Sequence, residues 1–393
     1  MSIKKNHKIS KMATLVLIVL ALLIGIYVLI TRFDLVYDSS KVKLTLDKKI
    51  ITLDPKENNY IETNKDQIIH ITKDGVIAYA LDGQQIWSET ISLTHIVTKQ
   101  KEPYLAVGEK MGRDIIVFND KGKKAAITTQ NPIVFFSVNQ KGFTTVIENR
   151  RDSHIVSMYN EEGKSVGVKR ITQIKEWGFP VAAEISPDNK LLFIVYVNGQ
   201  QPILTSTIVC IPTEKPKQEV VDSILYGIEH KDSFVYEVHF MNSNKWLAIG
   251  DKTVSLYNME GKQLWEKQNL RASYIPYLSS MMEFGEGYFP FVVSDGTNLN
   301  AIHRKDALMY LDSKGKEIFS KKFTQSVDYM YADKKGVIIG LGRDYYGFNK
   351  IGNQVFSYKA TKDISRLMYI DKSDKIVAQS KDEVFILKPT RQE

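Results

Sequence analysis

Apolar and polar positions follow two different patterns along the chain. Residues 12–30 form nineteen consecutive uncharged positions, most of them Leu, Ile, Val or Ala. As a helix this run is about 28 Å long, which matches the hydrocarbon core of a bilayer. From residue 43 onward, short runs alternate between apolar and polar residues, as half-buried strands do. The pattern predicts one transmembrane helix followed by an all-β body.

Charges around the apolar run predict its orientation. Residues 1–11 contain four lysines and no acid, and only Arg32 and Asp34 follow the run closely. Because positive charge is retained in the cytoplasm, we expect a cytoplasmic N-terminus and an extracytoplasmic body. A cleaved signal sequence is the alternative, and it gives the same location without the anchor. The expected organisation is a cytoplasmic basic tail at 1–11, a transmembrane helix at 12–30, a linker at 31–42 and a β domain at 43–393.

One hairpin motif recurs through the β domain. Asp or Asn opens a turn that contains Gly, and the next strand begins with a polar residue, an apolar residue and an aromatic residue. Gly supplies the positive φ that such turns require, and the aromatic side chain is expected to pack between layers. The copies lie at 80–87, 257–265, 311–319 and 348–356, with weaker ones at Gly122 and Gly163.

Two further turns recur along the chain, each at its own set of positions. A Ser-Pro-Asp-Asn-Lys-Leu turn within 185–192 has echoes at 240–247 and 370–377. A basic residue followed by Asp precedes strands at 73–74, 113–114, 151–152, 305–306, 343–344 and 381–382. Because this dipeptide recurs, we interpret it as a structural turn rather than an active site. Three turns that join four strands are typical of a propeller blade.

The spacing of the Gly hairpins predicts a β-propeller of eight four-stranded blades, each of about 43 residues, with seven blades as the alternative. The last unit lacks one strand. Residues 49–53 are strand-like and can supply it from the N-terminal side. Closure by strands from opposite ends of the chain removes the free edges of an open sheet.

The hairpins around Gly83 and Gly261 resemble the repeats of PQQ-like propellers, and the 185–192 turn resembles that of WD40-like and TolB-type propellers. An N-terminal anchor with such a domain resembles an uncharacterised class of bacterial membrane proteins. Quinoprotein dehydrogenases carry adjacent cysteines over their cofactor, whereas this chain has only Cys210. The resemblance therefore implies the architecture, and we expect no quinone or other cofactor. Trp87 and Trp265 are then interpreted as blade-packing residues.

Charge and cysteine content exclude several classes of function. Five of the eight net positive charges lie in residues 1–32, so the β domain is nearly neutral and nucleic-acid binding is not expected. A single cysteine permits no intrachain disulfide and no thiolate zinc cluster. Cys210 lies in a strand-like run and is expected to be a buried, inert thiol. The seven histidines are dispersed, so their spacing offers no metal site.

Glu237 and His239 are candidate channel-lining residues. At positions two apart they share one face of a strand, and the inner strands of a propeller line its central channel. A ligand contact is one interpretation of this pair. A polar pair with its hydrogen bonds satisfied inside the fold is the other.

Arg271, Tyr274 and Tyr277 are candidate partner-binding residues. They lie in the longest interval between Gly marks, from Gly261 to Gly315, where aromatic residues are dense. Long loops often carry function, and Tyr and Arg are enriched in binding hot spots. The alternative is that the aromatic residues of this stretch fill the core of a blade.

The functional hypothesis is a non-enzymatic scaffold or sensor, anchored to the outer face of a bacterial cytoplasmic membrane, that presents the propeller to a protein partner. No phosphate-binding loop, nucleophile elbow or zinc-protease motif is found in a fitting context. The alternative is a cell-surface enzyme or carbohydrate-binding module that uses the propeller channel, because propellers host both kinds of function.

Overall fold

The computed structural model describes residues 16–25, 42–200, 202–214, 223–268, 288–294 and 305–391. Residues 16–25 are helical, and the rest of the predicted transmembrane segment lies outside the described residues. Among the residues that the structure describes, no helix is both long enough and apolar enough to cross a membrane. Within the described ranges the body is all-β apart from one helical turn, α2 (Ile174–Trp177).

Consecutive strands pair into five four-stranded sheets. The first two sheets contain β2 (Tyr60–Asn64), β3 (Gln67–Ile71), β4 (Gly75–Tyr79), β5 (Gln85–Thr90), β6 (Ile96–Lys101), β7 (Tyr104–Glu109), β8 (Asp114–Asn119) and β9 (Gly122–Thr128). The next two contain β10 (Ile133–Val138), β11 (Thr144–Arg150), β12 (Ser153–Tyr159), β13 (Ser165–Gln173), β14 (Phe179–Ile185), β15 (Leu191–Asn198), β16 (Thr205–Pro212) and β17 (Tyr226–Lys231). The fifth contains β18 (Val235–Asn242), β19 (Lys245–Gly250), β20 (Val254–Asn258) and β21 (Gln263–Lys267).

The remaining strands form a three-stranded and an eight-stranded sheet. The smaller contains β22 (Tyr288–Ser294), β23 (Asp306–Asp312) and β24 (Glu317–Lys322). The larger contains β25 (Tyr329–Ala332), β26 (Val337–Leu341), β27 (Asp344–Phe348), β28 (Gln354–Lys359), β1 (Val42–Thr52), β31 (Glu383–Arg391), β30 (Ile376–Ser380) and β29 (Ile364–Tyr369), in that order.

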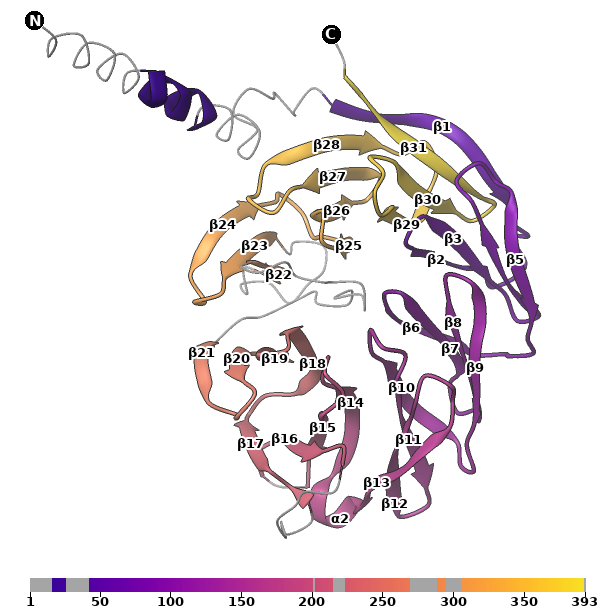
Figure 1. Ribbon diagram of the computed structural model, residues 1–393, viewed down its shortest axis with the longest axis vertical. Helices are drawn as coiled ribbons and strands as arrows, with labels where there is room; N and C mark the ends of the chain where they lie inside the picture. Colours follow the sequence, from indigo (N-terminus) through magenta and orange to yellow (C-terminus); the bar gives the residue numbers. More distant parts are fainter. Residues whose placement is uncertain are drawn as a thin grey trace, which may run out of the picture.

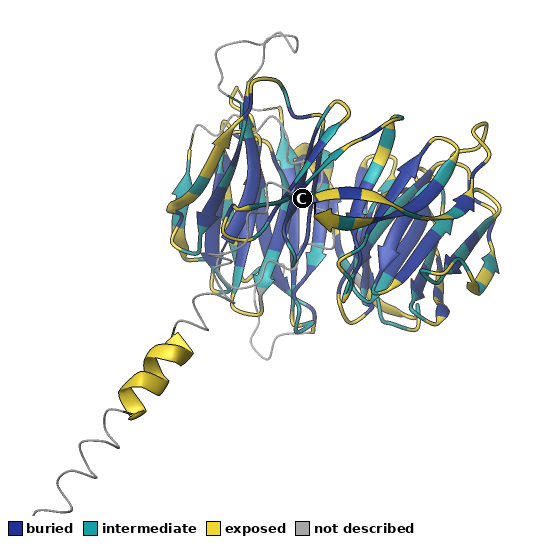
Figure 2. Cartoon of the chain, turned by 90° about the horizontal axis from the view of Figure 1, so that it is seen from above, coloured by how far each residue is buried: buried dark blue, intermediate teal, exposed yellow. Residues whose placement is uncertain are grey.

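The sheets stand around a common centre, as Figure 1 shows. In the four-stranded sheets the first strand is innermost, and the inner strands of neighbouring sheets contact one another, as β6, β10, β14 and β18 do. Most strand residues of the ring are buried, as Figure 2 shows, and their apolar side chains form clusters shared by neighbouring sheets. Each sheet therefore shares a core with its neighbours, which is the packing expected of a propeller-like fold.

Strands from opposite ends of the chain close the last unit. β1 pairs antiparallel with β31, from Val42 opposite Arg391 to Thr52 opposite Glu383. β1 also pairs parallel with β28 at Lys43 and Ser357. The predicted closing strand is thus confirmed, and it begins earlier than the sequence pattern indicates.

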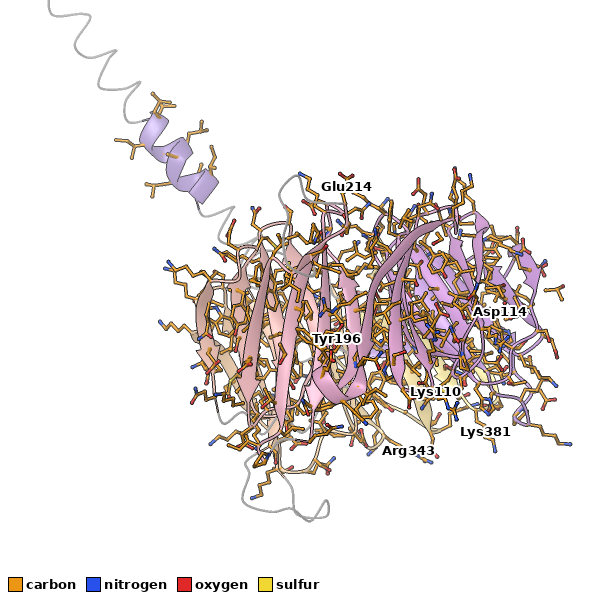
Figure 3. The ribbon with its side chains drawn as sticks, turned by 90° about the horizontal axis from the view of Figure 1, so that it is seen from below. Lys110, Asp114, Tyr196, Glu214, Arg343 and Lys381 are labelled. Carbon is orange, nitrogen blue, oxygen red and sulfur yellow. The ribbon has the colours of Figure 1, made fainter. Side chains whose placement is uncertain are left out.

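The two ends of the strands define two faces of the ring. The turns between the second and third strands of each unit form one face, which we call the distal face. Lys110, Arg343 and Lys381 mark it in Figure 3. The proximal face carries the Gly hairpins, and Glu214 lies on that side. Because Glu383 follows the distal turn at Lys381, the register places Val42 at the proximal face. The chain therefore enters the propeller from the proximal face.

The Gly hairpins join adjacent sheets as well as adjacent strands. The carboxylate of Asp312 accepts hydrogen bonds from the backbone N–H groups of Lys314 and Lys316, at 2.8 and 2.9 Å, and Gly315 has φ +75°. The indole of Trp265, on the preceding sheet, lies against Gly315 and donates to the carbonyl of Ser313 at 3.0 Å. The same contact joins Trp87 to Gly122 and Phe319 to Gly352. The predicted packing of the aromatic residues between layers is confirmed.

Candidate functional site

A polar cavity of about 290 Å³ lies inside the ring, between the inner strands β6, β10, β14 and β18. We call it the channel cavity. The structure places both sequence-predicted residues, Glu237 and His239, in its lining. Three further charged side chains join them there, namely Lys99, Lys101 and Glu184.

The strand β18 positions Glu237 and His239 on one face. Val235 and Val238 belong to the apolar core shared with the neighbouring sheet, while Glu237 and His239 line the cavity. The Nδ1 atom of His239 lies 3.9 Å from the Oε1 atom of Glu237. The register shifts between Val235 and Glu237, and such a bulge re-aims the side chains that follow it.

Burial in the channel cavity changes the acidity of both carboxyl groups. It raises the pKa of Glu237 to about 8, with a further contribution from the negative charge of Glu184, while Lys99 and Lys101 oppose the shift. Burial likewise raises the pKa of Glu184 to about 7, against the same two lysines and a hydrogen bond from Ser137. Both carboxyl groups therefore gain or lose a proton near neutral pH, so the charge of the cavity depends on pH.

Replacing Glu237 by Gln is expected to stabilise the protein by about 1–2 kcal/mol at pH 9 and to have little effect at pH 5. The folded-state pKa of about 8 exceeds the ordinary value of 4.5, so the folded protein retains a proton that the unfolded chain releases. Wild-type stability therefore falls as the pH rises through this window, and Gln removes that loss. The expected change in stability is modest because the Glu237 side chain is 27% exposed, and water partly solvates its charge.

Denaturant unfolding at several pH values measures this effect. The matched control is Glu229→Gln, on the outer strand β17, where the side chain is exposed. A Glu237→Gln variant whose stability follows the wild-type pH profile would show that this carboxyl group is not held protonated by burial.

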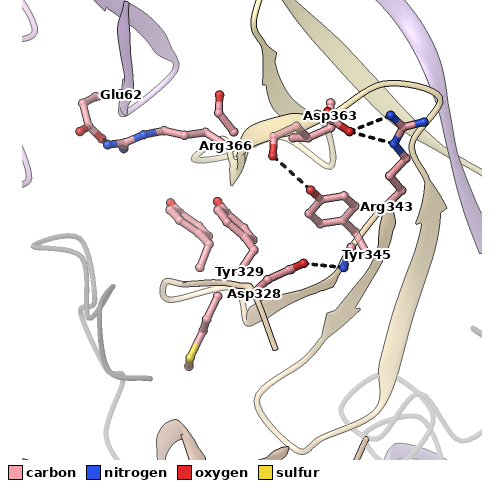
Figure 4. A pocket seen from close by; sticks show the side chains of 12 residues that line it. Glu62, Asp328, Tyr329, Arg343, Tyr345, Asp363 and Arg366 are labelled. Carbon is pink, nitrogen blue, oxygen red and sulfur yellow. Dashed lines mark hydrogen bonds and ion pairs between the residues drawn. The ribbon is translucent and has the colours of Figure 1, made fainter. Parts of the chain in front are cut away.

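A second cavity, of about 420 Å³, opens at the distal face (Figure 4). We call it the distal pocket. Its lining comes from β2, β25, β29 and the turn between β26 and β27. Arg366 donates to Glu62 at 2.9 Å, and Thr98 donates to the other carboxylate oxygen of Glu62 at the same distance. At the rim, Arg343 donates to Asp363 at 2.9 Å.

Two tyrosines of the distal pocket are fixed by their hydroxyl groups. Tyr329 donates to the carbonyl of Leu367 at 2.7 Å and accepts from its N–H at 2.9 Å. Tyr345 donates to the carbonyl of Ile364 at 3.2 Å. The two rings meet edge to face, with centroids 6.0 Å apart. Since each ring is held at its tip and along its side, the aromatic wall is preformed.

Other sequence predictions have mixed outcomes. Arg271, Tyr274 and Tyr277 lie outside the described residues, so their role stays a prediction. Tyr288 and Phe291, near the end of the same aromatic-rich stretch, are buried on β22, as the core-filling alternative expects.

Cys210 is fully buried on β16, as predicted, and burial raises the pKa of its thiol to about 12. In the part of the chain that the structure describes, His, Cys, Asp and Glu side chains form no cluster suited to a metal ion.

Sequence reasoning missed most of the charged lining of both cavities. Lys99 and Glu184 lie on different sheets from Glu237, so no local motif connects them. Recurrence favours a structural turn for the 343–344 dipeptide, and its Arg343 also pairs with Asp363 at the rim of the distal pocket. The signal that could have found this pair is a spacing of twenty residues, which recurs between Asp232 and Lys252.

Radially arranged antiparallel sheets whose inner strands line central cavities define a β-propeller-like protein. Saccharomyces cerevisiae Sqt1 resembles it with a TM-score of 0.50 and 12% identity, over 88% of this chain and 100% of that chain. BamB from Moraxella catarrhalis gives 0.49 and 11%, over 88% and 99%. Residues 35–388 match the model described as "Family of unknown function (DUF5711)", and the chain belongs to that family. A search of curated proteins gives no match.

Proposed function

We propose that this protein is a membrane-anchored, extracytoplasmic propeller of eight blades that serves as a non-enzymatic scaffold or sensor for a protein partner. The apolar run at 12–30 supports the anchor. Within it, the large apolar side chains of residues 16–25 are exposed on all sides of the helix, from 48% at Val19 to 66% at Leu17. A helix that is apolar all round needs apolar surroundings, which a bilayer supplies.

The sheet order supports the count of eight blades. The eight-stranded sheet divides at the single register pair between β1 and β28, which leaves β25–β28 as one blade and β29–β31 with β1 as another. The five four-stranded sheets and the sheet of β22–β24 supply the other six. The lysines of residues 1–11 favour a cytoplasmic N-terminus and hence an extracytoplasmic propeller.

The observation that carries the scaffold proposal is a group of exposed apolar side chains on the distal face. They lie on the sheets from β6 to β18: Met111, Val134, Ile171, Phe179, Ile203, Leu204 and Phe234. We call them the apolar group. Backbone hydrogen bonds join two pairs of the turns that carry them: the N–H of Met111 donates to the carbonyl of Ile133, and the N–H of Asp232 donates to the carbonyl of Leu204. Soluble proteins seldom expose several large apolar side chains together unless another protein covers them.

A double substitution of Phe179 and Ile203 by Ser is expected to abolish partner recovery. Both side chains are more than half exposed, so the fold should tolerate Ser at either position. The measurement is crosslinking on intact cells with a membrane-impermeant reagent, followed by capture of the full-length protein. Loss of apolar contact area removes the main favourable term in protein association.

The matched control is the double variant of Ile86 and Leu264 to Ser, since these side chains are exposed to a similar degree on the outer strands β5 and β21. We expect the control to recover the same partner as the wild type. If the Phe179 and Ile203 variant recovered that partner equally well, the apolar group would not be the docking surface.

A further inference from the structure

We propose that the distal pocket binds a neutral saccharide. This site is separate from the apolar group, because its lining comes from β2, β25, β29 and their neighbouring turns on the opposite side of the ring. Binding a saccharide there is therefore independent of whether a protein docks on the apolar group.

Both arginines of the pocket are already paired with carboxylates of its wall. Arg366 is paired with Glu62, Arg343 with Asp363, and the carboxylate of Asp328 accepts the N–H of Gly342 at 2.6 Å. An anionic ligand that reached the deeper pair would have to separate Arg366 from Glu62, and leaving either of these partly buried charges without its partner is costly. A neutral ligand can use the pairs as they stand.

Hydroxyl groups suit such a wall because each one both donates and accepts. A hydroxyl can donate to a carboxylate oxygen of Asp363 or Glu62 while it accepts from the adjacent guanidinium. Neighbouring hydroxyl groups of a sugar ring offer several such donor and acceptor positions side by side. Figure 4 shows the two arginine–carboxylate pairs at separate places on the pocket wall, and the Arg366 pair is the more buried of the two, so they can hold a ligand at two points.

The aromatic wall supplies the apolar contact that a sugar ring also needs. Tyr329 is half-buried and lines the pocket together with both arginine–carboxylate pairs, and the ring of Tyr345 meets it edge to face. A pyranose has one or more faces of C–H groups, which pack against the face of an aromatic ring. At about 420 Å³ the pocket is large enough for a monosaccharide or disaccharide. Because both tyrosines are held by hydrogen bonds, little ordering cost is expected on binding.

The test is a microarray of glycans probed with the full-length protein in detergent, followed by calorimetric titration of the strongest neutral ligand. We expect binding to at least one neutral mono- or oligosaccharide built of hexose or N-acetylhexosamine. The double variant of Arg343 and Asp363 to Ala is expected to lose about tenfold in affinity. These side chains are 56% and 89% exposed, so their removal should leave the thermal midpoint unchanged.

A matched control exists on the same face. Asp232 and Lys252 form an exposed pair at 2.8 Å in the equivalent turns of another unit, far from the pocket lining. Their double Ala variant is expected to keep affinity within about twofold of wild type. A Tyr329→Leu variant, checked for an intact fold, is expected to weaken binding while it retains apolar bulk. Failure of every neutral glycan to bind, preference for sialylated or sulfated glycans, or equal affinity of the two double variants would overturn the proposal.

Discussion

Replacing Leu44 and Ile51 by Ala together is expected to lower the free energy of unfolding by about 5 kcal/mol. Both side chains are buried on β1, where they belong to the core shared with Phe356 of β28 and Phe385 of β31. Each truncation removes apolar contacts and leaves a cavity that the surrounding sheet fills only in part. The loss is large because β1 joins the two ends of the propeller, and its release would expose the edges of β28 and β31.

Denaturant unfolding of the full-length protein, followed by tryptophan fluorescence, measures the change. Leu46 provides the control within the same strand, because its side chain is 64% exposed. Leu46→Ala is expected to change stability by less than about 0.5 kcal/mol. A loss from Leu46→Ala as large as that of the Leu44 and Ile51 double variant would mean that β1 does not pair in the register seen here.

Local physics explains which parts of the fold could be predicted from sequence. The hairpin at Gly315 can be recognised in the sequence because its turn needs a positive φ and a side-chain acceptor, and the residues that supply both lie within a few positions. The closing strand is visible because residues 49–53 alternate like the rest of the domain. Glu237 and His239 could be placed on one strand face because the period of a strand is two residues.

The composition of the candidate sites depends on contacts that sequence patterns do not encode. Glu62 and Arg366 are 304 residues apart, and they meet only because β1 and β31 bring the chain ends together. Lys99 and Glu184 converge on the channel cavity from two separate sheets. Each of these residues is an ordinary polar position of an alternating strand, so nothing local distinguishes a residue that lines a cavity from one that faces solvent.

The contact between Trp265 and Gly315 shows how the repeat motif holds neighbouring sheets together. A Cβ atom on Gly315 would lie 2.8 Å from the indole Cδ2 atom, well inside contact distance. The indole cannot simply turn away, because its Nε1–H donates to the carbonyl of Ser313. The aromatic residue and the glycine of the next hairpin are therefore one structural unit, although 50 positions separate them in the chain.

Gly315→Ala is accordingly expected to lower the free energy of unfolding by about 3 kcal/mol, from the strain of an L-residue at φ +75° and from overpacking against the indole. Gly342→Ala separates these two causes. Gly342 has φ +69°, and an added Cβ there meets no atom within 4 Å, so only the conformational cost of about 1 kcal/mol should appear.

A double-mutant cycle with Trp265→Ala tests the coupling itself. Removing the indole makes room for the new methyl group, so the loss in the double variant should be smaller than the two single losses together by about 1–2 kcal/mol. Denaturant midpoints of the four proteins give this value directly. Strictly additive losses would mean that the glycine is required only for its backbone conformation, and the recurrence of an aromatic residue against the next hairpin would then need another cause.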